Sequence, residues 1–193
     1  MHLILGLGNP GEEYRDTRHN VGFRVVEELA RRWEVPIDRL DCNALAGRLV
    51  LEEAGGEVLL ARPQTYMNRS GYAARCFAER YGIDPAAVLV VYDEINLPLG
   101  KIRLRRSGSP AGHRGLESVI ENLRTAEVPR LRLGIGAAEG RPAGEELVEL
   151  VLSPFAADEL ETAGEMVRRA ADACETWVRE GVEAAMNRHN GST

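Results

Sequence analysis

The stretch LILGLGNPGEEYRDTRHNVGF, residues 3–23, decides how this chain folds. It sets an apolar strand, a glycine-rich turn and a polar cluster around His19 directly before a helix. The helix is predicted to begin near Asn20 or Val21, because apolar residues recur at helical spacing from there, namely Phe23, Val26, Leu29, Ala30 and Trp33. The stretch supports two interpretations, which predict different proteins.

The first interpretation is a nucleotide-binding site. Gly6, Gly8 and Gly11 match the dinucleotide fingerprint of glycine, any residue, glycine, any two residues, glycine after a strand. In the second interpretation, Asn9 and His19 form an active site at the carboxyl end of the first strand. Open α/β sheets bind their ligands at that edge.

Three features favour the active site. Glu12 and Glu13 follow the third glycine, and their carboxylates would line a site meant for anionic phosphates. The helix begins too late to present its N-terminus to a pyrophosphate. The acidic residue of the fingerprint, expected about twenty positions further on, would fall within the helix as Glu27 or Glu28 instead of ending a second strand.

The composition is that of an ordinary globular protein, and a length of 193 residues predicts a single domain, 1–193. No apolar run approaches membrane-spanning length and the N-terminus lacks a signal-peptide pattern, so we expect a cytoplasmic protein with no membrane partner. Cys42, Cys76 and Cys174 share no close pair or metal-ligand spacing. We therefore expect reduced thiols, no disulfide framework and no zinc or other metal.

The net charge of −6 conceals a basic segment. Residues 95–142 hold nine Lys or Arg against four Glu. Within this segment Lys101, Arg103 and Arg105 alternate with apolar residues, which places all three on one face of a strand. That face suits a phosphate backbone, although charge alone favours the ordinary explanation, a solvated protein surface.

Strands and helices alternate along the chain. Strands are predicted at 2–7, 45–52, 58–61, 87–92 and 101–105. Helices are predicted at 21–33, 69–81 and 115–124, with a pair within 156–190, and loops at 108–112 and 137–144. This order predicts a three-layer α/β domain with a largely parallel sheet flanked by helices.

Polar residues follow the apolar strands at four places. They are Asn9 with His19, Asn68 after RPQTYM, Asp93 after VLVVY, and His113 beyond the basic strand. Each has an ordinary structural explanation when taken alone: Asn68 caps a helix, Asp93 begins a turn, and a lone histidine is more often structural than catalytic. Their combination favours a site, because parallel strands deliver their carboxyl ends to one edge of the sheet.

Several separated motifs now identify a resemblance. GLGNPG, RHNVGF, RPQTYMNRSG, YDEINLPLGKIRLRRSGS and GHRGLESV occur in unbroken order between about residues 2 and 136. Together they resemble the bacterial peptidyl-tRNA hydrolase family, with weaker similarity through ELVELVLSPF to the C-terminal helices. The resemblance implies hydrolysis of the ester between a peptide and the 3′ ribose of tRNA. It also implies a monomeric α/β protein with a mixed, mostly parallel sheet and no metal or organic cofactor.

The resemblance also implies roles for individual residues. His19 is the catalytic base and Asp93 is its carboxylate partner. The implied substrate-binding residues are Asn9, Tyr14, Met67, Asn68 and His113. We expect the tRNA phosphates to contact Lys101, Arg103 and Arg105, while Arg132 fits a phosphate contact and a structural role equally well.

The chemistry agrees with these roles. A neutral imidazole held by a carboxylate activates water for attack on an ester carbonyl at neutral pH, without a serine or cysteine nucleophile. We expect the helix N-terminus beside His19 to disfavour the protonated form of its ring. An amide of Asn9 or Asn68 is expected to stabilise the oxyanion, and the sequence does not decide between them.

One loop departs from the family pattern. The family has glycine, glycine, histidine, asparagine, glycine, whereas this chain has Ala111-Gly112-His113-Arg114-Gly115 after Pro110. Arg114 suits a phosphate contact or a solvent-exposed position, and Pro110 with Ala111 predicts a stiffer loop. The departure leaves an alternative, a non-catalytic RNA-binding relative on the same fold. Retention of a base and its carboxylate partner argues against that alternative.

Overall fold

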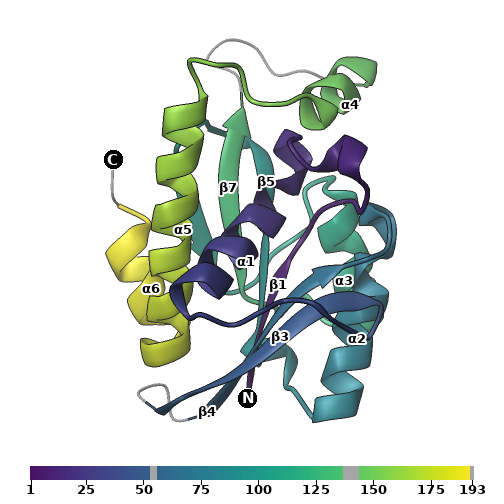
Figure 1. Cartoon of the computed structure of the whole chain (residues 1–193), viewed down its shortest axis with the longest axis vertical. Coiled ribbons are helices and arrows are strands. Elements are labelled where there is room, and N and C mark those ends of the chain that lie inside the picture. Colours follow the sequence, from purple (N-terminus) through teal and green to yellow (C-terminus); the bar gives the residue numbers. More distant parts are fainter. Residues whose placement is uncertain (53–55, 137–143, 192–193) are drawn as a thin grey trace.

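The computed structural model describes residues 1–52, 56–136 and 144–191. Its centre is a seven-stranded sheet in the order β2-β3-β4-β1-β5-β7-β6 (Figure 1). The strands are β1 (His2–Gly6), β2 (Arg39–Asp41), β3 (Ala44–Leu51), β4 (Gly56–Pro63), β5 (Val88–Pro98), β6 (Ile102–Arg105) and β7 (Arg130–Gly136). Strands β4, β1, β5 and β7 are parallel, while β2, β3 and β6 run antiparallel to their neighbours. The predicted mixed, mostly parallel sheet is confirmed.

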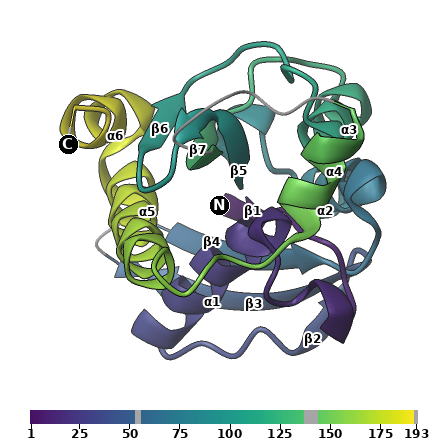
Figure 2. The same cartoon turned by 90° about the horizontal axis from the view of Figure 1, so that it is seen from above.

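Helices cover both faces of the sheet. The α-helices are α1 (Val21–Arg32), α2 (Ser70–Tyr81), α3 (Arg114–Leu123), α4 (Glu145–Leu152), α5 (Leu160–Glu180) and α6 (Val182–His189). Short 3-10 helices are η1 (Glu12–Tyr14), η2 (Arg18–Asn20), η4 (Met67–Arg69) and η5 (Pro85–Ala87). Helices α1, α5 and α6 pack on one face, and α2 and α3 pack on the other (Figure 2). The three predicted layers are confirmed.

Strand β1 lies in the middle of the sheet and separates two hydrophobic cores. Ile4 points into the core beneath α1 and α5, while Leu3 and Leu5 point into the core beneath α2 and α3. All three side chains are fully buried. A strand buried on both faces needs a continuous apolar run, which explains why residues 2–7 lack polar alternation.

The glycines of the N-terminal stretch allow close packing of α1 against the sheet. A Cβ atom on Gly6 would lie 2.3 Å from the carbonyl oxygen of Gly22, and one on Gly22 would lie 2.4 Å from the carbonyl oxygen of Val91. Gly11, with φ of 116°, precedes the 3-10 helix η1 and no α-helix. The fingerprint glycines therefore bring helix and strand together, and the third glycine does not open the helix that a pyrophosphate site requires.

Three regular elements were not predicted from the sequence. They are β2, β7 and α4, whereas α5 and α6 lie within the predicted range of 156–190. The loop at 108–112 is confirmed. Of the predicted loop at 137–144, residues 137–143 lie outside the described ranges, and Gly144 is the N-cap of α4. No helix in the described part of the chain is long and apolar enough to cross a membrane.

The expectation of reduced thiols without a disulfide is wrong for one pair. Cys42 and Cys76 form a disulfide, with their Cα atoms 5.4 Å apart. Cys42 lies in the turn between β2 and β3, and Cys76 lies on α2, so packing of α2 against this turn brings together residues that are 34 positions apart in sequence. Cys174 on α5 is a buried free thiol.

Candidate active site

A cavity of about 720 Å³ opens beyond the carboxyl end of β1 and beside residues 93–95 of β5, and α4 contributes to its lining. The predicted strand end at residue 92 is wrong, because β5 continues to Pro98 and Asp93 lies within it. One wall is polar and consists of Asn9, His19, Asn68, Asp93 and His113. Another wall is apolar and consists mainly of Leu147, Val148, Val151 and Leu152 from α4. The four predicted strand-end positions therefore meet in one cavity, at the sheet edge where α/β proteins bind ligands.

The backbone around His19 is held by the segment that leads into α5. The Arg18 amide donates to the carbonyl oxygen of Ser153 at 2.9 Å, and Thr17 forms an isolated β-bridge with Pro154. The buried guanidinium of Arg18 forms an ion pair with Glu159. These contacts fix the 3-10 turn η2, which projects the imidazole of His19 into the cavity.

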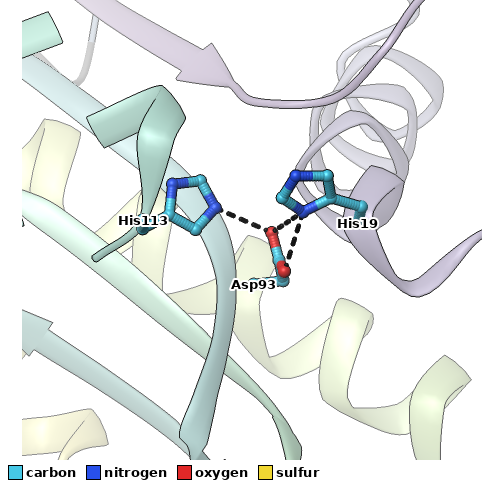
Figure 3. A group of neighbouring side chains, drawn as sticks. All are labelled: His19, Asp93 and His113. Atoms are coloured by element: carbon cyan, nitrogen blue, oxygen red, sulfur yellow. Dashed lines mark hydrogen bonds and ion pairs between the residues drawn. The ribbon is translucent and has the colours of Figure 1, made fainter. Parts of the chain in front are cut away.

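His19 and Asp93 form a close pair (Figure 3). Nδ1 of His19 lies 2.9 Å from both carboxylate oxygens of Asp93, whose side chain is only 3% exposed. A buried carboxylate accepts hydrogen bonds, so Nδ1 carries the proton in the neutral ring and Nε2 is left as the free lone pair. Nε2 has no hydrogen-bond partner among the residues that the structure describes.

The electrostatics of this pair differ from the sequence expectation. Burial lowers the pKa of His19, but the charge of Asp93 and its hydrogen bond outweigh burial, so the pKa is raised above its ordinary value. Burial would raise the pKa of Asp93, whereas the two neighbouring histidines hold it well below its usual range. The expected helix effect therefore does not set the direction of the His19 shift, because the carboxylate is closer and fully charged.

His113 contacts the same carboxylate from the other side. Its Nε2 lies 2.9 Å from Oδ1 of Asp93, and its Nδ1 accepts a hydrogen bond from the backbone amide of Leu116 at 3.2 Å. His113 is thereby the N-cap residue of α3. The ligand atoms of His19, Asp93 and His113 all lie within 4.8 Å of one another, so this trio is the group in the described ranges that has the donors for a metal ion.

Asn9 is fixed by three hydrogen bonds. Its Oδ1 accepts from the Met67 amide at 2.8 Å, its own amide donates to Oδ1 of Asn20 at 2.8 Å, and Nδ2 of Asn20 donates to its carbonyl oxygen at 2.9 Å. Because a backbone N–H only donates, the oxygen of the Asn9 side chain is identified without ambiguity. Its NH₂ group is therefore the part available to the cavity. From the sequence, Asn20 was expected only near the start of a helix, and its hydrogen bonds to the Asn9 backbone were not predicted.

The remaining predicted substrate residues occupy three different environments. Met67 is buried in the cavity wall, where a Cβ atom on Gly115 would lie 2.4 Å from its Sδ. Asn68 is exposed on the rim and makes no capping bond to α2, so the capping explanation does not apply. Tyr14, half-buried in η1, does not line the cavity.

The basic strand lies apart from the cavity. Lys101 and Arg103 are exposed and Arg105 is half-buried, and the predicted alternation with buried Ile102 and Leu104 is confirmed. β6 is the edge strand and pairs with β7. Arg132, opposite Arg103 in this pairing, instead binds the buried carboxylate of Glu94 through Nε and Nη2, so its structural explanation prevails.

The loop before α3 is anchored at its base and strained near its tip. Nη1 of the buried Arg130 donates to the carbonyl oxygens of Gly108 and Ser109. Ala111 has φ of 50°, a left-handed conformation in which a Cβ atom is unfavourable. Arg114 is exposed and lines the cavity mouth, so a contact with an anionic substrate is open to it.

The apolar wall was missed by the sequence analysis. Val148 is 51% exposed and Leu152 is 38% exposed, although both are large apolar side chains. The signal was present in ELVELVL, where Leu147, Val148, Val151 and Leu152 recur at helical spacing. An apolar helix face that remains uncovered beside a polar cluster is typical of a binding site.

Comparisons with known proteins agree with this geometry. The family model for peptidyl-tRNA hydrolase matches residues 3–193. The peptidyl-tRNA hydrolase of Synechococcus sp. (strain JA-3-3Ab) is 46% identical over 192 residues, which cover 98% of this chain and 83% of that protein. The peptidyl-tRNA hydrolase of Alkaliphilus oremlandii is 41% identical and covers 99% of this chain and 100% of its own.

A solved structure extends the agreement to three dimensions. The crystal structure of peptidyl-tRNA hydrolase from Acinetobacter baumannii matches with a TM-score of 0.91 and 35% identity, covering 100% of this chain and 96% of that one. The sequence relatives and the structural match agree over nearly the full length of the chain. This chain belongs to the peptidyl-tRNA hydrolase family.

Proposed function

We propose that this chain hydrolyses the ester between the peptide and the 3′ ribose of tRNA, with a water molecule activated by His19. Family membership over the full length supports the reaction. The observation that carries the mechanism is the pairing of His19 Nδ1 with buried Asp93 at 2.9 Å, which leaves Nε2 free toward the cavity. That arrangement is typical of a general base held by a carboxylate.

The reaction proceeds through a tetrahedral intermediate. Nε2 of His19 takes a proton from water as the water oxygen attacks the ester carbonyl carbon. Asp93 stabilises the imidazolium that forms. The imidazolium then returns the proton to the 3′ oxygen of the ribose as the C–O bond breaks, which releases tRNA and a peptide with a free carboxylate.

Asn9 is the better candidate for stabilising the oxyanion. Its side-chain oxygen is occupied by the Met67 amide, and its backbone is held on both sides by Asn20, so the NH₂ group is fixed in direction. Stabilisation of an oxyanion depends on donors that are already oriented before charge develops. Asn68 is exposed on the rim and lacks such anchors, which suits a contact with the substrate.

The substrate is recognised through two further surfaces. The apolar wall of α4 suits the side chains of a peptide held near its ester bond. The basic strand, with Lys101, Arg103 and Arg105, suits phosphates of the tRNA, and Arg114 at the cavity mouth suits a phosphate closer to the ester. A monomeric state, implied by the family resemblance, and a cytoplasmic location, expected from the sequence pattern, are further predictions.

The test is release of peptide from a purified N-acylaminoacyl-tRNA. We expect His19→Ala to lower kcat by about 10²- to 10⁴-fold, the range for loss of a general base. His189→Ala is the matched control, because His189 on α6 contacts Thr176 and does not line the cavity. Equal turnover by wild type and His19→Ala would overturn the mechanism, and binding of tRNA without turnover by wild type would favour the non-catalytic alternative.

A further inference from the structure

We propose that His113 is a positioning residue of this hydrolysis, holding Oδ1 of Asp93 so that the carboxylate is oriented and partly neutralised before it acts on His19. The inference rests on the proposed function and changes the role of His113 from substrate contact to support of the base. It is carried by the hydrogen bonds on the two sides of the His113 ring.

Two hydrogen bonds identify which nitrogen of the neutral His113 ring carries the proton. The Leu116 amide points at Nδ1 at 3.2 Å, and a backbone N–H can only donate. Nδ1 is therefore the unprotonated nitrogen, and the neutral ring carries its proton on Nε2. Nε2 lies 2.9 Å from Oδ1 of Asp93, so it donates to that oxygen.

The surroundings of the His113 ring hold it in one orientation. The Leu116 amide donates to Nδ1 at the start of α3, so the ring is anchored to the N-terminus of that helix. The His113 and Tyr92 ring centroids lie 4.6 Å apart, and the His113 side chain is only 11% exposed. The ring is therefore fixed beside Asp93.

Asp93 is the carboxylate that the two histidines share. Oδ1 of Asp93 accepts from both His113 and His19, whereas Oδ2 lies within hydrogen-bond distance of only one of the two rings, that of His19. A second donor fixes the rotation of the carboxylate and takes up part of its negative charge. His113 therefore moderates how strongly Asp93 attracts a proton onto His19.

Other charged side chains near His19 and Asp93 either form ion pairs of their own or are exposed to solvent. Glu94, the next residue on β5, is paired with Arg132 on β7. Arg18, beside His19 in η2, is paired with Glu159. Arg114 at the start of α3 is exposed at the cavity mouth.

Two amide substitutions separate the two contacts of His113. His113→Asn keeps an acceptor for the Leu116 amide, since asparagine is a favoured N-cap residue, but its short side chain does not reach Asp93. His113→Gln places an amide NH₂ near the position of Nε2 and retains a donor to Asp93, but it lacks a well-placed cap acceptor. Neither side chain titrates, and each keeps one of the two contacts.

The readout is the pH profile of kcat/KM with N-acylaminoacyl-tRNA. We expect His113→Asn to move the acid limb to higher pH by about 0.5 to 1 unit, because the full charge of Asp93 then acts on His19. His113→Gln should retain the wild-type limb, and KM should change less than twofold in both variants. A raised KM in both variants with an unmoved acid limb would overturn the proposal and make His113 a substrate contact.

A second measurement on the wild-type protein does not depend on turnover. Imidazole ¹⁵N chemical shifts recorded between pH 5 and 8 report the tautomer and protonation of each ring. We expect the neutral His113 ring to carry its proton on Nε2, the nitrogen that faces Asp93. A neutral His113 ring with its proton on Nδ1 would overturn the proposal, whereas absent turnover with the expected tautomer would count against the proposed function alone.

Discussion

Asp93 is contacted by two imidazoles that differ in what their second ring nitrogen can bind. His19 approaches it through Nδ1 and leaves Nε2 open to the cavity, while His113 approaches it through Nε2 and gives Nδ1 to a backbone amide. The same side chain and the same partner thus produce one ring whose second nitrogen faces the cavity and one whose second nitrogen is bound to the backbone. The difference teaches that the backbone around a histidine decides its function as much as its partner does.

Local structure explains the difference. His113 is the N-cap of α3 and accepts from Leu116. His19 lies one residue before the N-cap of α1, which is Asn20, and the Asn20 side chain makes no capping bond there because it is bonded to the backbone of Asn9. The shift of one residue relative to the helix start frees the second nitrogen of His19.

Removal of the shared carboxylate should have the largest effect on this comparison. We expect Asp93→Asn to lower kcat/KM by about 10²- to 10⁴-fold, because the base loses its orienting partner and the cation that forms is no longer stabilised. The acid limb should move to lower pH, since Asp93 raises the pKa of His19 and burial alone lowers it. The measurement is the pH profile of peptide release.

Asp41→Asn is the matched control for that substitution. Asp41 is a buried carboxylate that binds Arg80 and Tyr81 and does not line the cavity. It should affect stability without moving the acid limb. A loss of less than tenfold for Asp93→Asn, or an acid limb that moves upward, would contradict the assigned pair.

The two asparagines should differ by a smaller but clear margin. We expect Asn9→Ala to lower kcat by roughly 10²-fold or more, as loss of an oxyanion donor is worth about 3 kcal/mol, and Asn68→Ala to lower it by less than about tenfold. Asn9→Asp preserves the acceptor for the Met67 amide and removes the NH₂ donor. This variant therefore separates the structural role of the Asn9 side chain from its role as an oxyanion donor. A larger loss of kcat in Asn68→Ala than in Asn9→Ala would reverse the assignment.

Substitutions in the basic strand should weaken tRNA binding without moving the acid limb of the pH profile. We expect Lys101→Glu with Arg105→Glu to raise KM for peptidyl-tRNA by about tenfold at low salt and to reduce the salt dependence of log KM by roughly one per lost phosphate contact, with the acid limb unmoved. Arg31→Glu with Arg75→Glu makes the same charge change on α1 and α2. An unchanged KM at low and moderate salt would exclude this strand from tRNA binding.

The polar half of the site could be predicted from the sequence because its residues follow strong apolar runs. Asp93 follows the VLVVY run within β5, and Asn9 and His19 flank the turn after β1. Parallel strands place such residues at one edge, so order along the chain was enough. Which nitrogen of each histidine faces Asp93 was not predictable, because it depends on side-chain rotation within the folded site.

Strand β7 shows why other elements were missed. Its sequence RLRLGIG alternates arginine with apolar residues, which is typical of an exposed strand, yet it lies between β5 and β6. Arg130 is 2% exposed because carbonyl oxygens of Val128, Gly108 and Ala126 accept its hydrogens. Such long-range compensation of a buried charge leaves no local pattern in the sequence. The Cys42–Cys76 disulfide likewise depends on how α2 packs.

The components of the site are spread along most of the chain, from Asn9 after β1 to Leu152 at the end of α4. A copy that is still being synthesised is itself a peptidyl-tRNA, joined to its own tRNA by the kind of bond that the family hydrolyses. Asn9 and His19 emerge from the ribosome early, but Asp93 and His113 follow much later, and His19 has no carboxylate partner until they do. Under the proposed mechanism, the order of these residues therefore postpones hydrolytic competence until most of the polypeptide has been made.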